Sequence, residues 1–418
     1  MRTHEPSENA GGLRPVVWHC DADAFFAACH LAVDPTLRGR PLVVGGDPAT
    51  RHGIVLTATY EARPYGVKTA MPLAQALRLC PDLVVIPPDG ALYGAFSRRL
   101  MDLFAEFSPV VEPCSIDEAW LDMGGGALRP YAYDPVQGAR RLQSRVREEI
   151  GISVSIGVSS NKMLAKQASD MEKPAGITAL WPEDVPTRLW PLPVRALYGV
   201  GPKGSARLEA AGIHSIGDLA RAPAATLGTV LGGHAGPLQL RARGLDPSRV
   251  SVPVPGDEQS VSVERTLAHD VRDTADARPY LLSLADELAS RLRSHRRWGR
   301  TVILKYKTAR FVLHTRQTLL ASPTQDRDRL YQTALGLFAS RPHPEPVRLL
   351  GLGVSRLAET PGDLFENPRD LALERAVDDI RRRFGTGAIG PLAARRHGAH
   401  SPSTFRRHEP EPDDDESR

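Results

Sequence analysis

Short apolar runs alternate with amphipathic segments through residues 16–170, and their order restricts the possible folds more than any other feature of the chain. The runs typical of strands are Val16–Cys20, Pro109–Ser115, Ala119–Met123 and Val154–Ser159. The segments typical of helices are Phe25–Ala32, Tyr93–Glu106, Pro135–Ile150 and Asn161–Asp170. Because only a few residues separate the second and third runs, this order predicts an antiparallel sheet with helices on one face.

The rest of the chain predicts additional domains, since 418 residues exceed one ordinary core. Residues 33–89 hold small elements and form an inserted module. Residues 179–247 are helical with Gly-rich turns, and the Pro-rich residues 248–258 are typical of a linker. Strand and helix patterns return in 259–357, which predicts a second α+β domain. We expect residues 1–14 to be disordered and 358–418 to form a tail with one helical stretch.

Composition excludes several classes of protein. No apolar run reaches the roughly 20 residues that span a bilayer, and the N-terminus lacks the apolar segment of a secretion signal. The four cysteines, Cys20, Cys29, Cys80 and Cys114, show no CxxC spacing, so neither a disulfide framework nor a zinc site is indicated. A cytoplasmic protein without membrane contact is expected.

The distribution of charge favours a nucleic-acid binder. Residues 259–357 hold 17 Lys and Arg against nine Asp and Glu, whereas the last eleven residues hold six acids and one Arg. Only seven of the 53 basic residues are Lys, and three of these, Lys162, Lys166 and Lys173, fall within twelve residues. This concentration marks the segment as one to examine for function.

Two acidic clusters follow strands of the predicted sheet. Asp21 and Asp23 lie in CDADAFF, and Asp117 and Glu118 lie in SIDEA. Each cluster alone is explained at least as well by a capped turn or a solvated surface. If the strand ends meet, however, three carboxylates repel one another unless a cation neutralises them, and hard oxygen ligands select Mg²⁺ or Mn²⁺.

A pair of such ions can hold the attacking and leaving oxygens of an in-line displacement. We expect Asp21 and Asp117 to bridge both ions and Glu118 to bind the one that activates the attacking hydroxyl. The carbonyl of Ala22 would complete the nucleotide-side ion, and Asp23 would be structural.

Donors for a triphosphate are also present in the sequence. Tyr60 and Arg63 are three residues apart in TATYEAR, and Lys173 precedes Pro174 at the predicted end of a helix. A packed Tyr, a surface Arg and a solvated Lys are the alternatives for these three residues. Lys162 and Lys166 are one turn apart and are expected only to decorate their helix.

Five motifs in order carry a family resemblance: CDADAFFA, TATYEARPYGVKTAMP, CSIDEAWLD, SIGVSSNKMLAKQASDMEKPAGI and YGVGPKGSARLEAAGI. They resemble those of the Y-family translesion DNA polymerases, most closely the bacterial DNA polymerase IV branch, over about residues 16–357. The resemblance implies a right-hand polymerase with a palm at 15–32 and 90–178, fingers at 33–89, a thumb at 179–247 and a little finger at 259–357. It implies low-fidelity, template-directed synthesis without proofreading.

The resemblance also implies roles for individual residues. Asp21, Asp117 and Glu118 would be the metal ligands, and Tyr60, Arg63 and Lys173 would bind the deoxynucleoside triphosphate. Phe26 falls at the family's steric gate, where an aromatic ring leaves no room for a 2′-hydroxyl. Its alternative is a core aromatic beside Phe25. Leu56 departs from the family pattern, in which many members carry a smaller residue near the templating base.

Two regions are expected to hold primer–template DNA. Gly199 and Gly201 in GVG are typical of a helix-hairpin-helix, whose backbone N–H groups approach phosphate. Lys305 and Lys307 alternate on one predicted strand and so share a face. With Arg310, Arg316 and the arginines of 291–300 they predict a phosphate-binding surface, although the helical cluster could be a solvated face.

The tail contains GDLFEN, in which Leu364 and Phe365 resemble the end of a sliding-clamp-binding peptide. The family's leading Gln is absent there, and burial of the pair against the protein is the alternative. We expect a monomer. Two other functions remain open at this point: a non-catalytic DNA-binding scaffold and a template-independent nucleotide cyclase, which primer extension and template-dependent product length would distinguish.

Overall fold

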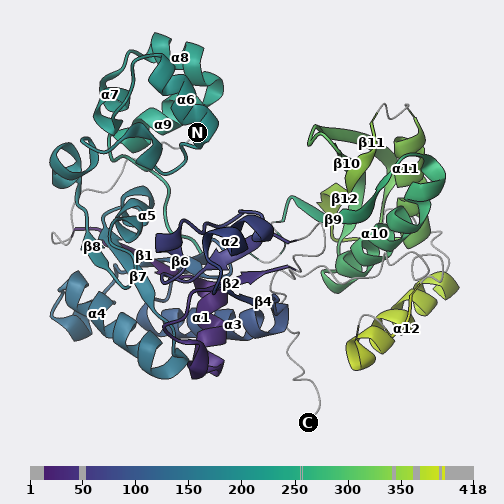
Figure 1. Cartoon of the computed structure of the whole chain (residues 1–418), viewed down its shortest axis with the longest axis horizontal. Coiled ribbons are helices and arrows are strands. Elements are labelled where there is room, and N and C mark those ends of the chain that lie inside the picture. The colour runs from purple at the N-terminus through teal and green to yellow at the C-terminus, as the bar shows by residue number, and fades with distance from the viewer. Residues whose placement is uncertain are drawn as a thin grey trace, which may run out of the picture. The chain divides into compact units, whose positions relative to one another are not determined.

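The computed structural model describes residues 14–46, 53–254, 256, 258–340, 345–360, 368–385 and 388–390 (Figure 1). These residues form an N-terminal unit, 14–45 and 55–253, and a C-terminal unit made mainly of residues 254–390. The predicted disordered segment 1–14 lies outside them except for Arg14, and the clamp-like pair Leu364 and Phe365 also lies outside them. No helix in the described ranges is both long enough and apolar enough to cross a membrane.

A five-stranded sheet in the order β5-β6-β1-β7-β8 organises the N-terminal unit. Its strands are β1 Val17–Ala22, β5 Val111–Pro113, β6 Glu118–Asp122, β7 Val154–Ser159 and β8 Ile177–Ala179. All neighbours are antiparallel except β7 and β8, which are parallel. The four strands predicted from the sequence are confirmed, whereas the three-residue β8 has too short an apolar run to be recognised.

The main helices of this unit are α1 Phe25–Val33, α3 Gly90–Phe107, α4 Pro135–Arg145 and α5 Lys162–Met171. A Cβ on Gly138 of α4 would lie 2.9 Å from the Trp18 ring, so α4 packs closely on the Trp18 face of β1. A Cβ on Gly157 of β7 would lie 1.9 Å from the carbonyl oxygen of Ala165, so α5 packs closely on the other face. The prediction that all helices cover one face is therefore wrong.

A small three-stranded sheet occupies the predicted inserted module, in the order β3-β2-β4. Its elements are β2 Leu42–Gly45, β3 Val55–Ala58, α2 Leu73–Leu79 and β4 Val84–Ile86. The apolar side of α2 packs with Val43 and Val55 into a core that is separate from the core of the large sheet. A separate core supports the interpretation of this segment as an insertion.

Short helices make up the last part of the N-terminal unit: α6 Pro202–Ala210, α7 Ile216–Arg221, α8 Ala224–Leu231 and α9 Ala235–Ala242. Residues 248–258 were predicted to be a linker, but the start of this segment and the residues just before it are held against the unit. Asp246 accepts a hydrogen bond from the backbone N–H of Met163 at 3.1 Å, and the N–H of Ser251 donates to Glu112 at 2.9 Å. Only the later residues can therefore act as a connection.

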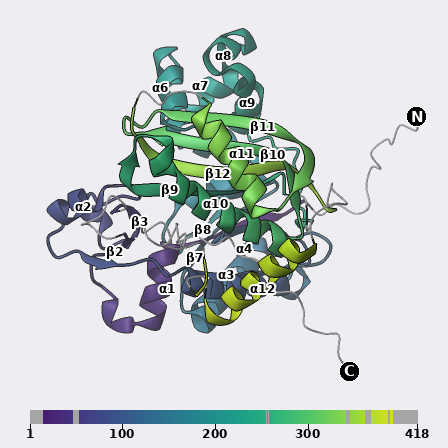
Figure 2. The same ribbon diagram turned by 90° about the vertical axis from the view of Figure 1, so that its right-hand side faces the viewer.

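The C-terminal unit is an antiparallel sheet in the order β11-β10-β12-β9 with helices packed on one face (Figure 2). Its elements are β9 Ser260–Val271, α10 Thr274–Ser294, β10 Trp298–Thr308, β11 Leu313–Thr324, α11 Arg327–Ala339, β12 Val347–Ala358 and α12 Pro368–Phe384. Ion pairs connect α12 to α10, joining Arg293 to Asp378 and Arg381 to Asp286, each at 2.6 Å. The predicted α+β domain is confirmed.

Candidate active site

Strand register brings the two acidic clusters together. Asp21 on β1 lies opposite Glu118 on β6, and the backbone N–H of Ala22 donates to the carbonyl of Asp117 at 3.0 Å. The hairpin between β5 and β6 therefore delivers both of its acids to the end of β1. The structure thus brings Asp21, Ala22, Asp117 and Glu118 together where β1 ends and β6 begins.

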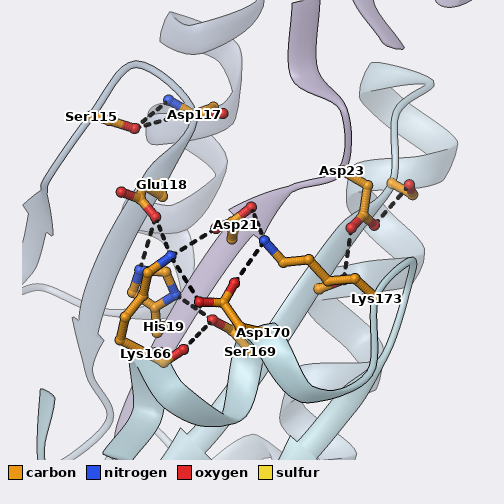
Figure 3. A network of polar contacts seen from close by, with 12 residues as sticks. His19, Asp21, Asp23, Ser115, Asp117, Glu118, Lys166, Ser169, Asp170 and Lys173 are labelled. Atoms are coloured by element: carbon orange, nitrogen blue, oxygen red, sulfur yellow. Dashed lines mark hydrogen bonds and ion pairs between the residues drawn. The ribbon is translucent and has the colours of Figure 1, made fainter. Parts of the chain in front are cut away.

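Lys166 lies between two of these carboxylates (Figure 3). Its ammonium donates to Asp21 at 3.0 Å and to Glu118 at 2.7 Å, from a side chain that is only 11% exposed. The sequence predicted that Lys166 only decorates α5, and this prediction is wrong. A helix position cannot reveal such a role by itself, because the partners come from strands more than 40 residues away; the scarcity of Lys in the chain was the one available signal.

Lys173 approaches the same site from the segment that follows α5. Its ammonium lies 2.7 Å from Asp21 and 3.0 Å from Asp170. Burial alone would lower the pKa of Lys173, but the neighbouring Asp21 and Asp170 outweigh it and raise that pKa. Both lysines are therefore cations held against the carboxylate cluster.

The pKa values of the acids depend on their burial and on the charges around them. Burial, together with the nearby Asp21 and Glu118, raises the pKa of Asp117, although Ser115 donates a hydrogen bond to its carboxylate. Burial also opposes ionisation of Glu118, but contacts with His19 and Lys166 outweigh it and hold the Glu118 pKa below its ordinary range. The cluster contains more carboxylates than its lysines fully neutralise.

This donor set fits hard divalent cations. Carboxylate and carbonyl oxygens are the ligands that Mg²⁺ and Mn²⁺ prefer. Burial and the nearby Asp21 and Glu118 raise the pKa of Asp117, and a cation placed among the three carboxylates would favour its ionised form. The carbonyl of Ala22 belongs to the same strand end, so it is available as a further oxygen.

Asp23, the remaining acid of the first cluster, is committed to hydrogen bonds. Its carboxylate accepts from Ser153 at 3.0 Å, Ser155 at 2.8 Å and the backbone N–H of Ala175 at 2.8 Å. Tyr60 also donates its hydroxyl to Asp23, at 3.4 Å. Asp23 therefore fixes the segment that carries Lys173 against β7.

Tyr60 and Arg63 lie together beside this site. The Arg63 guanidinium stacks 3.9 Å above the Tyr60 ring, and its Nε donates to the carbonyl of Ala58 at 3.3 Å. The Tyr60 hydroxyl contacts Asp23, while Lys173 contacts Asp21, the acid two residues earlier on the chain. Tyr60 and Lys173 thus contact acids at the end of β1, and Arg63 is connected to that place only through the Tyr60 ring.

Phe26 lies on α1, the helix that begins just after the acidic strand end. Its ring centroid is 4.5 Å from that of Tyr93 and 5.7 Å from that of Phe25. The side chain is half-buried and packs on the main core, and its partner Tyr93 is also hydrogen-bonded to His30 at 3.0 Å. It is thus neither a fully buried core residue nor a freely exposed one.

Gly199 and Gly201 precede α6, as the sequence predicted. Gly199 has a φ of +96°, and a Cβ there would lie 2.4 Å from an Arg241 guanidinium nitrogen. The positive φ favours glycine at this position, whereas the flexible end of the Arg241 side chain could move aside. A Cβ on Gly201 would meet no atom within 4 Å, so the helix start at Gly201 is open.

The C-terminal sheet separates the predicted phosphate-binding residues. Lys305 and Lys307 lie on the face of β10 opposite the buried Leu304 and Tyr306. Lys305 pairs with Glu264 at 2.5 Å. Arg310 is 81% exposed and pairs with Glu345 at 3.2 Å.

Two arginines of the predicted surface are placed elsewhere. Arg316 lies opposite Leu304, on the helix-covered face, and donates to the carbonyls of Leu337 and Phe338. Arg293 is buried against α12 by its ion pairs. The single phosphate-binding surface predicted from sequence is therefore wrong for these two residues.

Sequence reasoning missed His19, which lies two residues before Asp21 on the same face of β1. His19 is fully buried, its Nδ1 is 2.8 Å from the Ser169 hydroxyl, and its Nε2 is 3.4 Å from Glu118. Burial lowers the pKa of His19. The i, i+2 spacing to Asp21 was the signal that could have identified it.

Comparisons with known proteins agree with this architecture. Residues 20–170 match the impB/mucB/samB family, residues 258–364 match its C-terminal domain, and residues 182–213 match its HHH motif. The chain is 42% identical over 376 residues to DNA polymerase IV of Moorella thermoacetica, which covers 88% of this chain and 94% of the relative. It is 36% identical to DNA polymerase IV 1 of Bacillus subtilis, with 90% and 92% of the two chains covered.

A similar solved structure is a Y-family DNA polymerase chimera. It superposes with a TM-score of 0.73 at 26% sequence identity, covering 82% of this chain and 100% of the chimera. The right-hand polymerase architecture predicted from the sequence is thereby confirmed. The chain belongs to the Y family of DNA polymerases, in its DNA polymerase IV branch.

Proposed function

We propose that this chain is a low-fidelity DNA-directed DNA polymerase whose active site is the carboxylate cluster of Asp21, Asp117 and Glu118. The observation that carries the proposal is the register that sets Asp21 opposite Glu118 with Asp117 beside them. Two divalent cations, Mg²⁺ or Mn²⁺, would supply charge stabilisation for the primer hydroxyl and the transferred phosphoryl group. Asp21 and Asp117 would hold both ions, Glu118 one, and the Ala22 carbonyl the other.

Three side chains would act on the nucleotide: Lys173, Tyr60 and Arg63. In this structure Lys173 is paired with Asp21 and Asp170, so binding a triphosphate requires its ammonium to exchange a carboxylate for a phosphate. Arg63 can bind phosphate bidentately, and the Tyr60 hydroxyl can donate. Together they would orient the triphosphate against the carboxylates.

Phe26 would exclude ribonucleotides. Its half-buried ring is held by Tyr93 at the start of α1, next to the metal-binding strand end. A ring fixed at this place leaves no space for a 2′-hydroxyl, since its packing partners prevent it from turning away. Deoxynucleoside triphosphates would then be the preferred substrates.

We assign the palm to residues 15–32 and 90–178, the fingers to 33–89, the thumb to 179–247 and the little finger to 259–357. The separate core of the inserted module and the small size of its sheet support the fingers assignment. Primer–template DNA would contact Gly201, Lys305, Lys307 and Arg310, while Gly199 shapes the turn. The family resemblance alone supports a cytoplasmic monomer that uses Leu364 and Phe365 to bind a sliding clamp.

Primer extension with a matched pair of variants tests the active site. Asp117→Ala should abolish extension yet retain DNA binding, because it removes an oxygen ligand without touching the second half of the protein. Asp122→Ala, at the other end of the same hairpin, removes only a turn hydrogen bond to Gly124 and should extend primers normally. Near-normal extension by Asp117→Ala would remove the metal assignment and favour a non-catalytic scaffold.

A further inference from the structure

The orientation of the His19 ring is fixed by its neighbours. The Ser169 hydroxyl donates to the carbonyl of Lys166 at 2.8 Å, so its oxygen is placed to accept from His19 Nδ1. When the ring hydrogen is on Nδ1, the Nε2 lone pair can bind a metal ion, which would take the place of the hydrogen that Nε2 otherwise donates to Glu118. The imidazole is fully buried, so no bulk water can take that position.

Two other ligand atoms face this nitrogen. Glu118 Oε2 is 3.4 Å from Nε2, and Cys114 Sγ is 4.0 Å from it. Within the described residues these three side chains form the one group whose ligand atoms all lie within 4.8 Å of one another. A nitrogen lone pair, a carboxylate oxygen and a sulfur therefore converge on one point.

We propose that His19, Cys114 and Glu118 form a Zn²⁺ site distinct from the proposed catalytic ions. Nitrogen and sulfur ligands select Zn²⁺ over Mg²⁺, and three protein ligands with one water are a common zinc coordination. The hydrogen bond from Nδ1 to Ser169 orients the imidazole, as outer partners do in zinc proteins. Neither Asp21 nor Asp117 belongs to this set.

Solvent reaches the site at Cys114, so a zinc ion can enter there and the thiol proton can leave. Cys114 is exposed, in contrast to the three other cysteines, which are buried. When the Zn–S bond forms, the S–H bond breaks and its proton passes to solvent. Lys166 occupies Oε2 of Glu118, but a carboxylate has two oxygens and about four acceptor positions, so the ion and the ammonium can share it.

Sharing of Glu118 predicts competition between metals. Zn²⁺ bound through Glu118 removes that carboxylate from the proposed polymerase site, so zinc should inhibit primer extension. This consequence depends on the proposed function, whereas zinc binding itself does not. The two are therefore measured separately.

Binding is measured on the full chain after chelator treatment, without DNA or nucleotide. Zn²⁺ competition against a chromophoric chelator should show one site, and Co²⁺ should give a thiolate-to-metal absorption band. Cys114→Ser should lose that band and weaken Zn²⁺ binding by more than the about 10–100-fold typical of losing an outer partner. Cys80→Ser, a thiol outside the site, should bind like wild type; equal Zn²⁺ binding by Cys114→Ser and wild type overturns the proposal.

A second variant tests the role of the His19 imidazole separately from that of the Cys114 thiol. Ser169→Ala removes the partner that orients His19 and should weaken Zn²⁺ binding by about 10–100-fold while keeping the Co²⁺–thiolate band. Unchanged affinity in this variant would also contradict the site, because the His19 tautomer would then not matter.

Extension assays complete the test. With Mg²⁺ present, added Zn²⁺ should inhibit wild type at lower concentration than it inhibits Cys114→Ser, each compared with its own zinc-free rate. Absence of extension before zinc is added contradicts the proposed function. Normal extension without zinc binding contradicts only the zinc site.

Discussion

The N-terminal and C-terminal units use lysine in opposite ways. Lys166 is 11% exposed and lies within 3.0 Å of two carboxylates from different strands. Lys305 is 40% exposed and pairs with one carboxylate, Glu264, that is itself 51% exposed. The same side chain is therefore an internal counter-ion in one sheet and a surface charge in the other.

The two lysines differ in how much their ion pairs contribute to stability. Removing one partner of a buried ion pair leaves an uncompensated charge in a poorly solvated place, which is costly, whereas an exposed pair contributes little. A buried lysine therefore fixes the geometry of the acids around it. An exposed lysine can exchange its partner for a phosphate at almost no cost in free energy.

The largest expected effect follows from removing the internal counter-ion. Lys166→Met, studied with chelator present, should lower the free energy of unfolding of the N-terminal unit by about 3–5 kcal/mol, because Asp21 and Glu118 lose their shared cation. Lys305→Met should change it by less than about 1 kcal/mol. Hydrogen exchange of peptides from β1 and α5 measures the stability of the N-terminal unit alone.

Divalent cations sharpen this first comparison. Mg²⁺ that binds the folded cluster should restore part of the lost stability in Lys166→Met, because any ligand of the folded state stabilises it. No such recovery is expected for Lys305→Met. A Lys166→Met protein as stable as wild type in chelator would show that this lysine does not hold the acids together.

The sequence predicted the acids of this site more successfully than their partners. Strand ends and local spacing are short-range signals, so Asp21, Asp117 and Glu118 were expected to meet, and helix α5 was expected at Asn161–Asp170, where the Asn161 side chain caps it. The role of Lys166 depends on how α5 packs over β1 and β7. That packing depends on the close approach of α5 to Gly157, which no local sequence pattern predicts.

The second prediction concerns acid stability. Contacts with His19 and Lys166 hold the pKa of Glu118 below its ordinary value of 4.5 in the folded state. Its stabilising contribution is therefore present above about pH 4.5 and is lost as the pH falls below that value. Glu118→Gln should cost about 1.5–3 kcal/mol near neutral pH, as expected for hydrogen bonds to a charged group, and progressively less in acid.

The exposed pair provides the control for this pH dependence. Glu264→Gln should stay within about 1 kcal/mol of wild type at all pH values, since its partner Lys305 lies in water. Urea unfolding between pH 3 and 7 in chelator measures both differences. A difference between wild type and Glu118→Gln that grows as the pH falls would reverse the assigned sign.

The third prediction concerns Arg316, which the sequence misplaced. Its guanidinium donates to the carbonyls of Leu337 and Phe338 and to the Tyr306 hydroxyl, so it ties β11 to the end of α11. Arg316→Ala should destabilise the C-terminal unit by about 1–3 kcal/mol, because partly buried carbonyls lose their donors. DNA affinity, measured where the variant is fully folded, should stay close to wild type.

The misplacement has a simple physical origin. Side chains alternate along a strand, so the face that Arg316 occupies depends on how the turn from β10 to β11 sets the register. The register places Arg316 opposite Leu304 and Thr315 opposite Lys305. A shift of one residue would have put Arg316 beside Lys305, and sequence periodicity alone cannot distinguish the two registers. A large loss of DNA affinity without loss of stability in Arg316→Ala would contradict the observed face.

The smallest expected effect belongs to Lys307, on the open face of β10. A lysine that neutralises one DNA phosphate contributes about one unit to the slope of the logarithm of affinity against the logarithm of salt concentration. Lys307→Ala should therefore lower that slope by about one and leave the free energy of unfolding nearly unchanged. Lys173→Ala should do the opposite: it should weaken nucleotide binding, measured as a higher KM, and keep the DNA salt slope. An unchanged slope in Lys307→Ala would mean that this face of the sheet does not meet phosphate, and the contrast between an internal and an external use of lysine would then rest on stability alone.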